Sequence, residues 1–172
     1  LTDLGENNRV SNSLWSVTGQ PVPANAANSE YAAMTSQYAA ARDIDQTSTV
    51  LDGISCFVGG ADYEKLERAH LLNSSEYTVN KALGYVSLKT SLQTDQVLAV
   101  AYEYTYGGVT YQVGEFASDI TDSNKALYVK ALKNTSNNPH QGNWGLMMNN
   151  VYYLASSVEK EKFLLDVKFQ SD

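Results

Sequence analysis

The sequence predicts an α+β fold in which a predominantly antiparallel sheet follows one or two helices in the N-terminal third. Apolar residues recur at helical spacing near the start, between residues 28 and 53. From Tyr77 onward, segments rich in Val and Tyr alternate with short turn-forming pieces, which is typical of strands. The length of 172 residues suits one domain with its own core. We therefore expect a single domain, 1–172, with a helical and irregular part (1–60) and a β-rich part (61–172).

Composition limits the classes of partner. The net charge is −7, and the 12 basic residues are scattered among acids, so no basic face is available for nucleic acid. No apolar run approaches the roughly 20 residues that a membrane-spanning helix needs. The chain begins with Leu1 rather than Met, and we expect it to be an excised piece of a longer protein.

Two helices are predicted in the first part. Asn28 is a suitable N-cap for the segment 29–42, and Glu30 lies favourably in its first turn. A second, short helix is expected from Asp45 towards Leu51, with Gly53 ending it. The apolar stripe of the first helix comprises Tyr31, Met34, Tyr38 and Ala41. Residues 1–26 are rich in Asn, Gly and Pro and read as an irregular segment anchored by Leu14, Trp15 and Val17.

Strands are predicted in the second part at 76–80, 84–88, 97–106 and 109–116. The closing segment 163–169 alternates with a period of two and predicts a half-buried final strand. Residues 62–72 fit either a helical stripe or a partly exposed strand. No internal repeat or interdomain linker appears.

The Gly107-Gly108 pair predicts a two-residue hairpin turn, because glycine accepts the positive φ angles of primed turns. The register then places aromatic and aliphatic residues on one face and small or polar residues on the other. The first face pairs Tyr106 with Val109, Tyr104 with Tyr111, Tyr102 with Val113 and Val100 with Glu115. The second face pairs Thr105 with Thr110, Glu103 with Gln112 and Ala101 with Gly114.

Two interpretations of these tyrosines remain open. The rings are either structural side chains of the sheet or part of a surface that meets a partner or a neighbouring domain. We expect Trp144 and the Met147-Met148 pair to pack in the core, although Trp144 also qualifies as a contact. The candidate contact residues are therefore Tyr102, Tyr104, Tyr111 and Trp144.

No residue pattern predicts catalysis, a cofactor or a metal site. His70 and His140 have no nucleophile motif beside them, and the single Cys56 reads as a small core residue. The acid pairs Asp43/Asp45 and Asp119/Asp122 do not have EF-hand spacing, and turn formation explains them equally well. We expect a protein that is not an enzyme, with no catalytic, cofactor-binding or metal-binding residues.

Two long stretches resemble one known family. NSSEYTVNKALGYVSL (73–88) followed by VLAVAYEYTYGGVTYQVGEF (97–116) is similar to a segment of the SprA/Sov family, very large outer-membrane proteins of gliding motility and type IX secretion. NWGLMMNNVYYLA and the closing EKEKFLLDVKFQSD resemble the family's W-D-L-M-M-K-N-V-Y segment and its terminal strand. DLGENNRV and ANSEYAAM resemble the same family near the start. The chain departs at Gly145, where the family commonly has an acid, and at Asn149, where it commonly has Lys.

The resemblance implies a non-enzymatic structural or partner-contact domain of a secretion translocon. It implies a place in the outer membrane or cell envelope, with the domain on the extracellular side or, alternatively, in the periplasm. The implied partners are neighbouring regions of the same large chain, other secretion-system envelope proteins and exported cargo. The alternative from the residues alone is a carbohydrate- or peptide-binding module, in which exposed aromatic rings contact the ligand.

Overall fold

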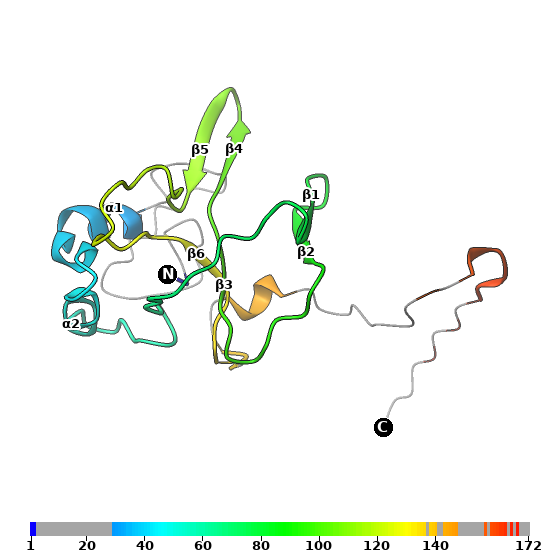
Figure 1. Ribbon diagram of the computed structural model, residues 1–172, viewed down its shortest axis with the longest axis horizontal. Helices are drawn as coiled ribbons and strands as arrows, with labels where there is room; N and C mark the ends of the chain where they lie inside the picture. The colour runs from blue at the N-terminus through cyan, green and yellow to red at the C-terminus, as the bar shows by residue number, and fades with distance from the viewer. Residues whose placement is uncertain are drawn as a thin grey trace.

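The computed structural model describes residues 1–2, 29–136, 138–140, 143–147, 157, 159–164, 166 and 168. Helices occupy the N-terminal part of this region, and three two-stranded antiparallel sheets follow them (Figure 1). The fold is therefore α+β, as the sequence predicts. No helix of the described residues is long and apolar enough to cross a bilayer.

The helical part contains α1 (Ser29–Ser36), the 3₁₀ helix η2 (Ala39–Arg42) and α2 (Thr47–Asp52). The single helix expected over 29–42 is thus divided at Gln37 and Tyr38. Near the end of α1, the hydroxyl groups of Thr35 and Ser36 donate to backbone carbonyls one turn earlier, an interaction that weakens helices. Gly53 follows α2 as predicted, and the proposed cap Asn28 lies outside the described residues.

Each sheet is a pair of short antiparallel strands. β1 (Tyr77–Asn80) pairs with β2 (Tyr85–Leu88), and β4 (Tyr102–Tyr106) pairs with β5 (Val109–Val113). The long strand expected over 97–106 is divided at Ala101, because its first half, β3 (Leu98–Val100), pairs instead with β6 (Lys130–Lys133).

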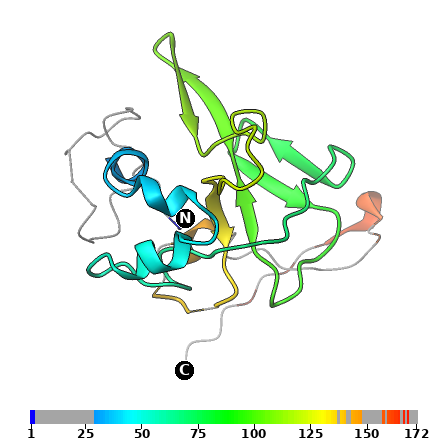
Figure 2. The same ribbon diagram turned by 60° about the vertical axis from the view of Figure 1, so that its left-hand side comes forward.

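The β4–β5 hairpin has the predicted turn and register. Gly107 and Gly108 both have positive φ angles, 59° and 80°, as a primed turn requires. All five pairs from Tyr106–Val109 to Tyr102–Val113 are as expected. The register does not continue beyond the Tyr102–Val113 pair. Val100, the expected partner of Glu115, lies in β3 and pairs with Lys130. Figures 1 and 2 show the hairpin projecting away from the rest of the chain.

The hydrophobic core lies between the helical part and the segment that leads into β6. The buried residues of this cluster are Ala33, Met34, Ala41, Leu51, Ile54, Phe57, Tyr63 and Tyr128. Phe57 stacks on Tyr63 with ring centroids 5.6 Å apart, and the Tyr63 hydroxyl donates to Asp52. The core prediction for Cys56 is wrong: this residue is exposed and lies in a turn, with a φ angle of 61°.

Two other predicted elements are corrected. Residues 62–72 form neither a helix nor a strand: Tyr63 is buried in the core, whereas Leu66 and Leu71 are exposed. In the predicted final strand, Phe163 and Leu164 are exposed and lie outside any strand, after the 3₁₀ helix η4 (Lys160–Lys162). A period of two produces a strand only where a neighbouring strand supplies hydrogen bonds. Leu165, Val167 and Phe169 lie outside the described residues, as do Leu14, Trp15 and Val17.

Candidate functional site

The tyrosine face is the surface of the β4–β5 hairpin formed by Tyr102, Tyr104, Tyr106, Val109 and Tyr111. Tyr104 stacks on Tyr111 across the strands, with ring centroids 5.3 Å apart and an interplanar angle of 21°. Tyr102 lies against Tyr104 with centroids 6.1 Å apart. Such contacts between rings stabilise a hairpin beyond simple burial.

Exposure varies along this face and is greatest beside the turn. Val113 is buried at the base, and Tyr104 and Tyr111 are half-buried in the middle. Tyr102 is 40% exposed, and Tyr106 and Val109 near the turn are 52% and 49% exposed. The tyrosines therefore lie outside the main hydrophobic cluster, and both interpretations, structural rings and contact surface, stay open. They stabilise the hairpin itself and leave an aromatic surface in solvent.

The fourth candidate, Trp144, lies elsewhere. It begins the 3₁₀ helix η3 (Trp144–Leu146), which lies beside β6 and away from the hairpin tip (Figures 1 and 2). Trp144 and Met147 are half-buried and border a cavity of only about 10 Å³. The structure thus brings Tyr102, Tyr104 and Tyr111 together and separates Trp144 from them. Met148 lies outside the described residues.

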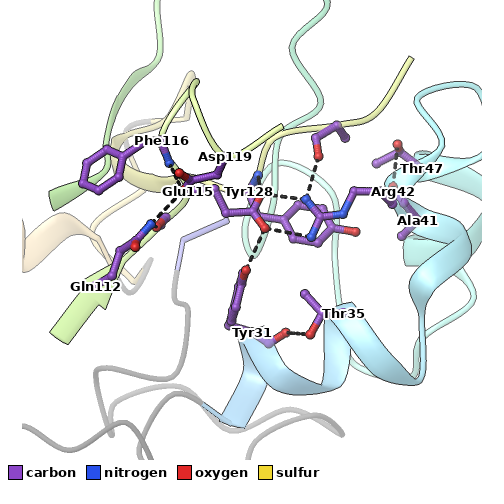
Figure 3. A network of polar contacts seen from close by, with 12 residues as sticks. Tyr31, Thr35, Ala41, Arg42, Thr47, Gln112, Glu115, Phe116, Asp119 and Tyr128 are labelled. Atoms are coloured by element: carbon purple, nitrogen blue, oxygen red, sulfur yellow. Dashed lines mark hydrogen bonds and ion pairs between the residues drawn. The ribbon is translucent and has the colours of Figure 1, made fainter. Parts of the chain in front are cut away.

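A second notable feature is a buried ionic cluster at the base of the hairpin (Figure 3). The Glu115 carboxylate, only 6% exposed as a residue, forms a bidentate ion pair with Arg42 of η2, at 2.6 and 2.7 Å. It also accepts hydrogen bonds from the Tyr31 hydroxyl and from the backbone N–H of Tyr128. The Arg42 guanidinium lies 4.1 Å from the centre of the Tyr128 ring, a cation–π contact.

The cluster changes the acidity of its members. Burial alone would raise the pKa of Glu115, but the hydrogen bonds from Arg42, Tyr128 and Tyr31 outweigh burial and lower it. Burial and the hydrogen bond to Glu115 raise the pKa of Tyr31 to about 12. Glu115 is therefore ionised and Tyr31 keeps its proton at neutral pH. The arrangement joins α1 and η2 to the segment between β5 and β6.

An open pocket of about 530 Å³ lies beside this cluster. Most polar groups along its wall already have partners within the chain. Asp119 accepts hydrogen bonds from the Phe116 backbone and from the Gln112 amide, which lower its pKa, and Asp122 accepts from the Asn124 backbone. The lining residues are Tyr31, Arg42, Gln112, Gly114, Glu115, Asp119, Ile120, Thr121, Asp122 and Lys125. Their pairing favours a structural role for these groups.

The other residues weighed for chemistry lie apart from this cluster. His70 is exposed near Glu76, and His140 is exposed in a turn. The Asp43 carboxylate accepts from the Asp45 backbone, as expected of a turn residue. Across the described ranges, no three His, Cys, Asp or Glu side chains lie close enough to hold a metal ion.

Sequence reasoning missed the role of Glu115. The predicted register places this residue on the aromatic and aliphatic face of the ribbon, opposite Val100, and supplies no partner for its carboxylate. A charged residue on an otherwise apolar face is the signal that could have found the cluster, because a buried carboxylate requires a cationic partner. The identity of that partner, Arg42, could not be read from the sequence, because 73 positions separate the two residues.

Comparisons of the chain with models of known protein families, with curated proteins and with solved structures find no match.

Proposed function

We propose that this chain is a non-enzymatic partner-contact domain of a type IX secretion outer-membrane translocon, with a role in protein export and gliding motility. The resemblance of residues 73–88, 97–116, 143–155 and 159–172 to the SprA/Sov family supports the assignment to type IX secretion. The observation that carries the contact role is the exposed tyrosine face on a hairpin that projects from the molecule. On this proposal the domain lies in the cell envelope, on the extracellular side of the outer membrane, and needs no cofactor.

The geometry suits a contact role in two ways. Tyrosine supplies a large apolar surface and a hydroxyl at low cost in side-chain entropy, and it is enriched in protein interfaces. The base of the hairpin is also anchored, because Glu115 follows β5 by two residues and forms an ion pair with Arg42. A surface that is ordered before binding loses less entropy when its partner arrives.

A second candidate function is a peptide-binding module, which the exposure of Tyr102 and Tyr106 favours. The ring geometry favours a peptide over a carbohydrate as ligand. Tyr104 and Tyr111 stack on each other, so each covers one face of the other ring, whereas sugars bind by stacking on free aromatic faces. The two candidates differ in whether the chain is a domain of the translocon or an independent binding module of a cell-surface protein.

The export role can be tested in the organism that carries the gene. We expect that the triple variant Tyr102→Ser, Tyr106→Ser and Val109→Ser reduces the amount of exported protein in the medium, because it removes the apolar contact surface while retaining the Tyr104–Tyr111 stack. The measurement is quantitative proteomics of the medium, with the outer-membrane abundance of the variant as the reference for each culture.

A matched control replaces exposed apolar residues on the other hairpin, Val79→Ser and Val86→Ser, which lie opposite each other in β1 and β2. We expect export in this control to remain at the wild-type level. Export that continues unchanged after loss of the whole gene would contradict the proposed function. Equal loss of export in both variants would contradict the assignment of the contact to the tyrosine face.

A further inference from the structure

Within the part of the chain that the structure describes, no strand pairs with the outer edge of β4. Among the described residues, β4 has one neighbouring strand, β5, and no backbone hydrogen bond joins Glu103 or Thr105 to a residue beyond the pair. In a two-residue hairpin, the residues that flank the turn exchange hydrogen bonds, and bonding then alternates along the ribbon. Glu103 and Thr105 therefore direct their N–H and C=O groups outward. An open edge of this kind is a template for pairing with another strand.

The hairpin itself, residues 102–113, carries one charged side chain, the acid Glu103. Between Lys89 and Lys125 the sequence contains no Lys, Arg or His, while its acids are Asp95, Glu103, Glu115, Asp119 and Asp122. Arg42 neutralises Glu115, but Glu103 is exposed on the hairpin, and Asp119 lies near its base through a hydrogen bond with Gln112. A segment beside β4 thus meets negative charge on the face of Glu103 and apolar surface on the face of Tyr106.

We propose that the outer edge of β4 binds an extended, positively charged peptide segment by strand addition, with Lys or Arg alternating with apolar residues. Backbone hydrogen bonds to Glu103 and Thr105 supply the affinity. The basic side chains lie on the face of Glu103, and the apolar side chains lie beside Tyr106. This inference rests on the proposed partner-contact function and specifies the chemistry of the partner.

Charge favours a basic peptide over a second copy of the chain as the partner of β4. Antiparallel pairing of two β4 strands would bring Glu103 close to its own copy, and each chain carries a net charge of −7. Like charges on neighbouring strands are destabilising, whereas opposite charges contribute favourably. Electrostatic attraction to a basic segment also accelerates association.

The test measures binding of a fluorescent Lys-Val repeat peptide, about nine residues long and thus able to span β4, to the 172-residue chain by fluorescence anisotropy. A matched peptide has Glu in place of each Lys. We expect the basic peptide to bind at least about tenfold more tightly than the acidic peptide, and its affinity to fall as salt is added.

Two variants locate the binding edge. Thr105→Pro removes one outward N–H group of β4, and we expect it to weaken binding about tenfold, because proline blocks strand addition while edge strands tolerate it. Thr110→Pro makes the same change on the outer edge of β5 and should leave binding unchanged.

A third variant tests the charge. Glu103→Lys, which changes charge without altering the backbone, should also weaken binding about tenfold. Near-ultraviolet circular dichroism of the stacked tyrosines reports whether each hairpin stays folded.

Four outcomes overturn the inference. Two concern the peptides: the basic peptide does not bind, or the basic and acidic peptides bind equally. The third is that Thr110→Pro, rather than Thr105→Pro, abolishes binding. The fourth is that the chain forms a dimer in sedimentation and that Thr105→Pro dissociates this dimer. None of these results depends on export. Export that persists without the gene would contradict the proposed function, whereas failure of peptide binding with gene-dependent export contradicts only the assignment of the β4 edge.

Discussion

At the scale of single residues, Glu115 connects the two halves of the described structure. A buried carboxylate is tolerated only when it is paired and hydrogen-bonded, and each Glu115 oxygen accepts two bonds. Those bonds come from α1, from η2 and from the backbone that leads into β6. One side chain therefore joins the N-terminal helices α1 and η2 to the distant segment that leads into β6.

Replacing Glu115 by Gln should lower the free energy of unfolding by about 3 kcal/mol, because Arg42 would keep its charge in a largely buried place without a carboxylate partner. Chemical denaturation followed by circular dichroism measures this difference. The matched control is Glu103→Gln on the exposed face of the same hairpin, which should change stability by less than about 0.5 kcal/mol. Similar values for the two variants would show that the cluster contributes no more than a surface charge.

Stability should also depend on pH through Glu115. Its pKa in the folded chain lies below the ordinary value of 4.5, so its contribution is fully present above pH 4.5 and disappears as the pH falls through the folded pKa. Urea unfolding at a series of pH values between 7 and 2 measures this loss. Exposed acids such as Asp119 also titrate in this range, so the informative quantity is the difference between the wild type and Glu115→Gln. We expect that difference to shrink with acidification, and a constant difference would contradict the assignment.

At the scale of elements, Ala101 and Gly114 form the base at which the hairpin leaves the rest of the chain. A Cβ atom on Gly114 would lie 3.1 Å from the Ala101 Cβ and 3.2 Å from the Val100 carbonyl oxygen. Gly114 also has a φ angle of 75°. Glycine at this position therefore satisfies both a backbone conformation and a close approach between two segments.

Substitutions at two glycines should separate these two effects. Gly108 has a φ angle of 80°, but nothing lies within 4 Å of a Cβ atom placed there. Gly108→Ala should therefore cost about 1 kcal/mol for backbone strain alone. Gly114→Ala should cost about 2 to 3 kcal/mol, because crowding against Ala101 adds to the same strain. Thermal and urea unfolding measure both values, and equal losses would contradict the close packing at the hairpin base.

The tyrosine stack predicts a further contrast. Tyr104→Ala removes the contacts with Tyr102 and Tyr111, and should lower the free energy of unfolding by about 1 kcal/mol, because the rings stabilise the hairpin rather than the core. Tyr63→Ala, in the core, should cost about 3 kcal/mol or more. Denaturant titrations of the two variants provide the comparison. A Tyr104→Ala loss as large as that of Tyr63→Ala would place the tyrosine face in the core.

The elements that sequence reasoning predicted well are those specified locally. The Gly107-Gly108 turn and the alternation around it determine the β4–β5 register without reference to the rest of the chain. The division of the predicted strand at Ala101 was not predictable in this way, because it depends on β6, which follows later in the sequence. The exposure of Phe163 has a similar cause: alternation shows which side chains share a face, but not whether any surface covers that face.

At the scale of the whole molecule, the described residues form a packed region around Met34 and Leu51, the β3–β6 pair and two exposed hairpins, β1–β2 and β4–β5 (Figure 2). The candidate site was predictable in part. Tyr102, Tyr104 and Tyr111 could be grouped from local pairing, whereas the position of Trp144 and the Arg42–Glu115 pair required the tertiary arrangement. The contact surface is therefore formed by one local hairpin, and the long-range Arg42–Glu115 cluster anchors the base of that hairpin.

The most direct test of the contact role is photo-crosslinking in cells that produce the protein, with a photoreactive amino acid in place of Tyr106 and, as a control, of Val58. Both positions are similarly exposed, at 52% and 56%, but only Tyr106 belongs to the tyrosine face. We predict a discrete crosslinked product from Tyr106 that contains another envelope or exported protein, and none from Val58. Absence of a product at Tyr106, or the same products at both positions, would contradict the account.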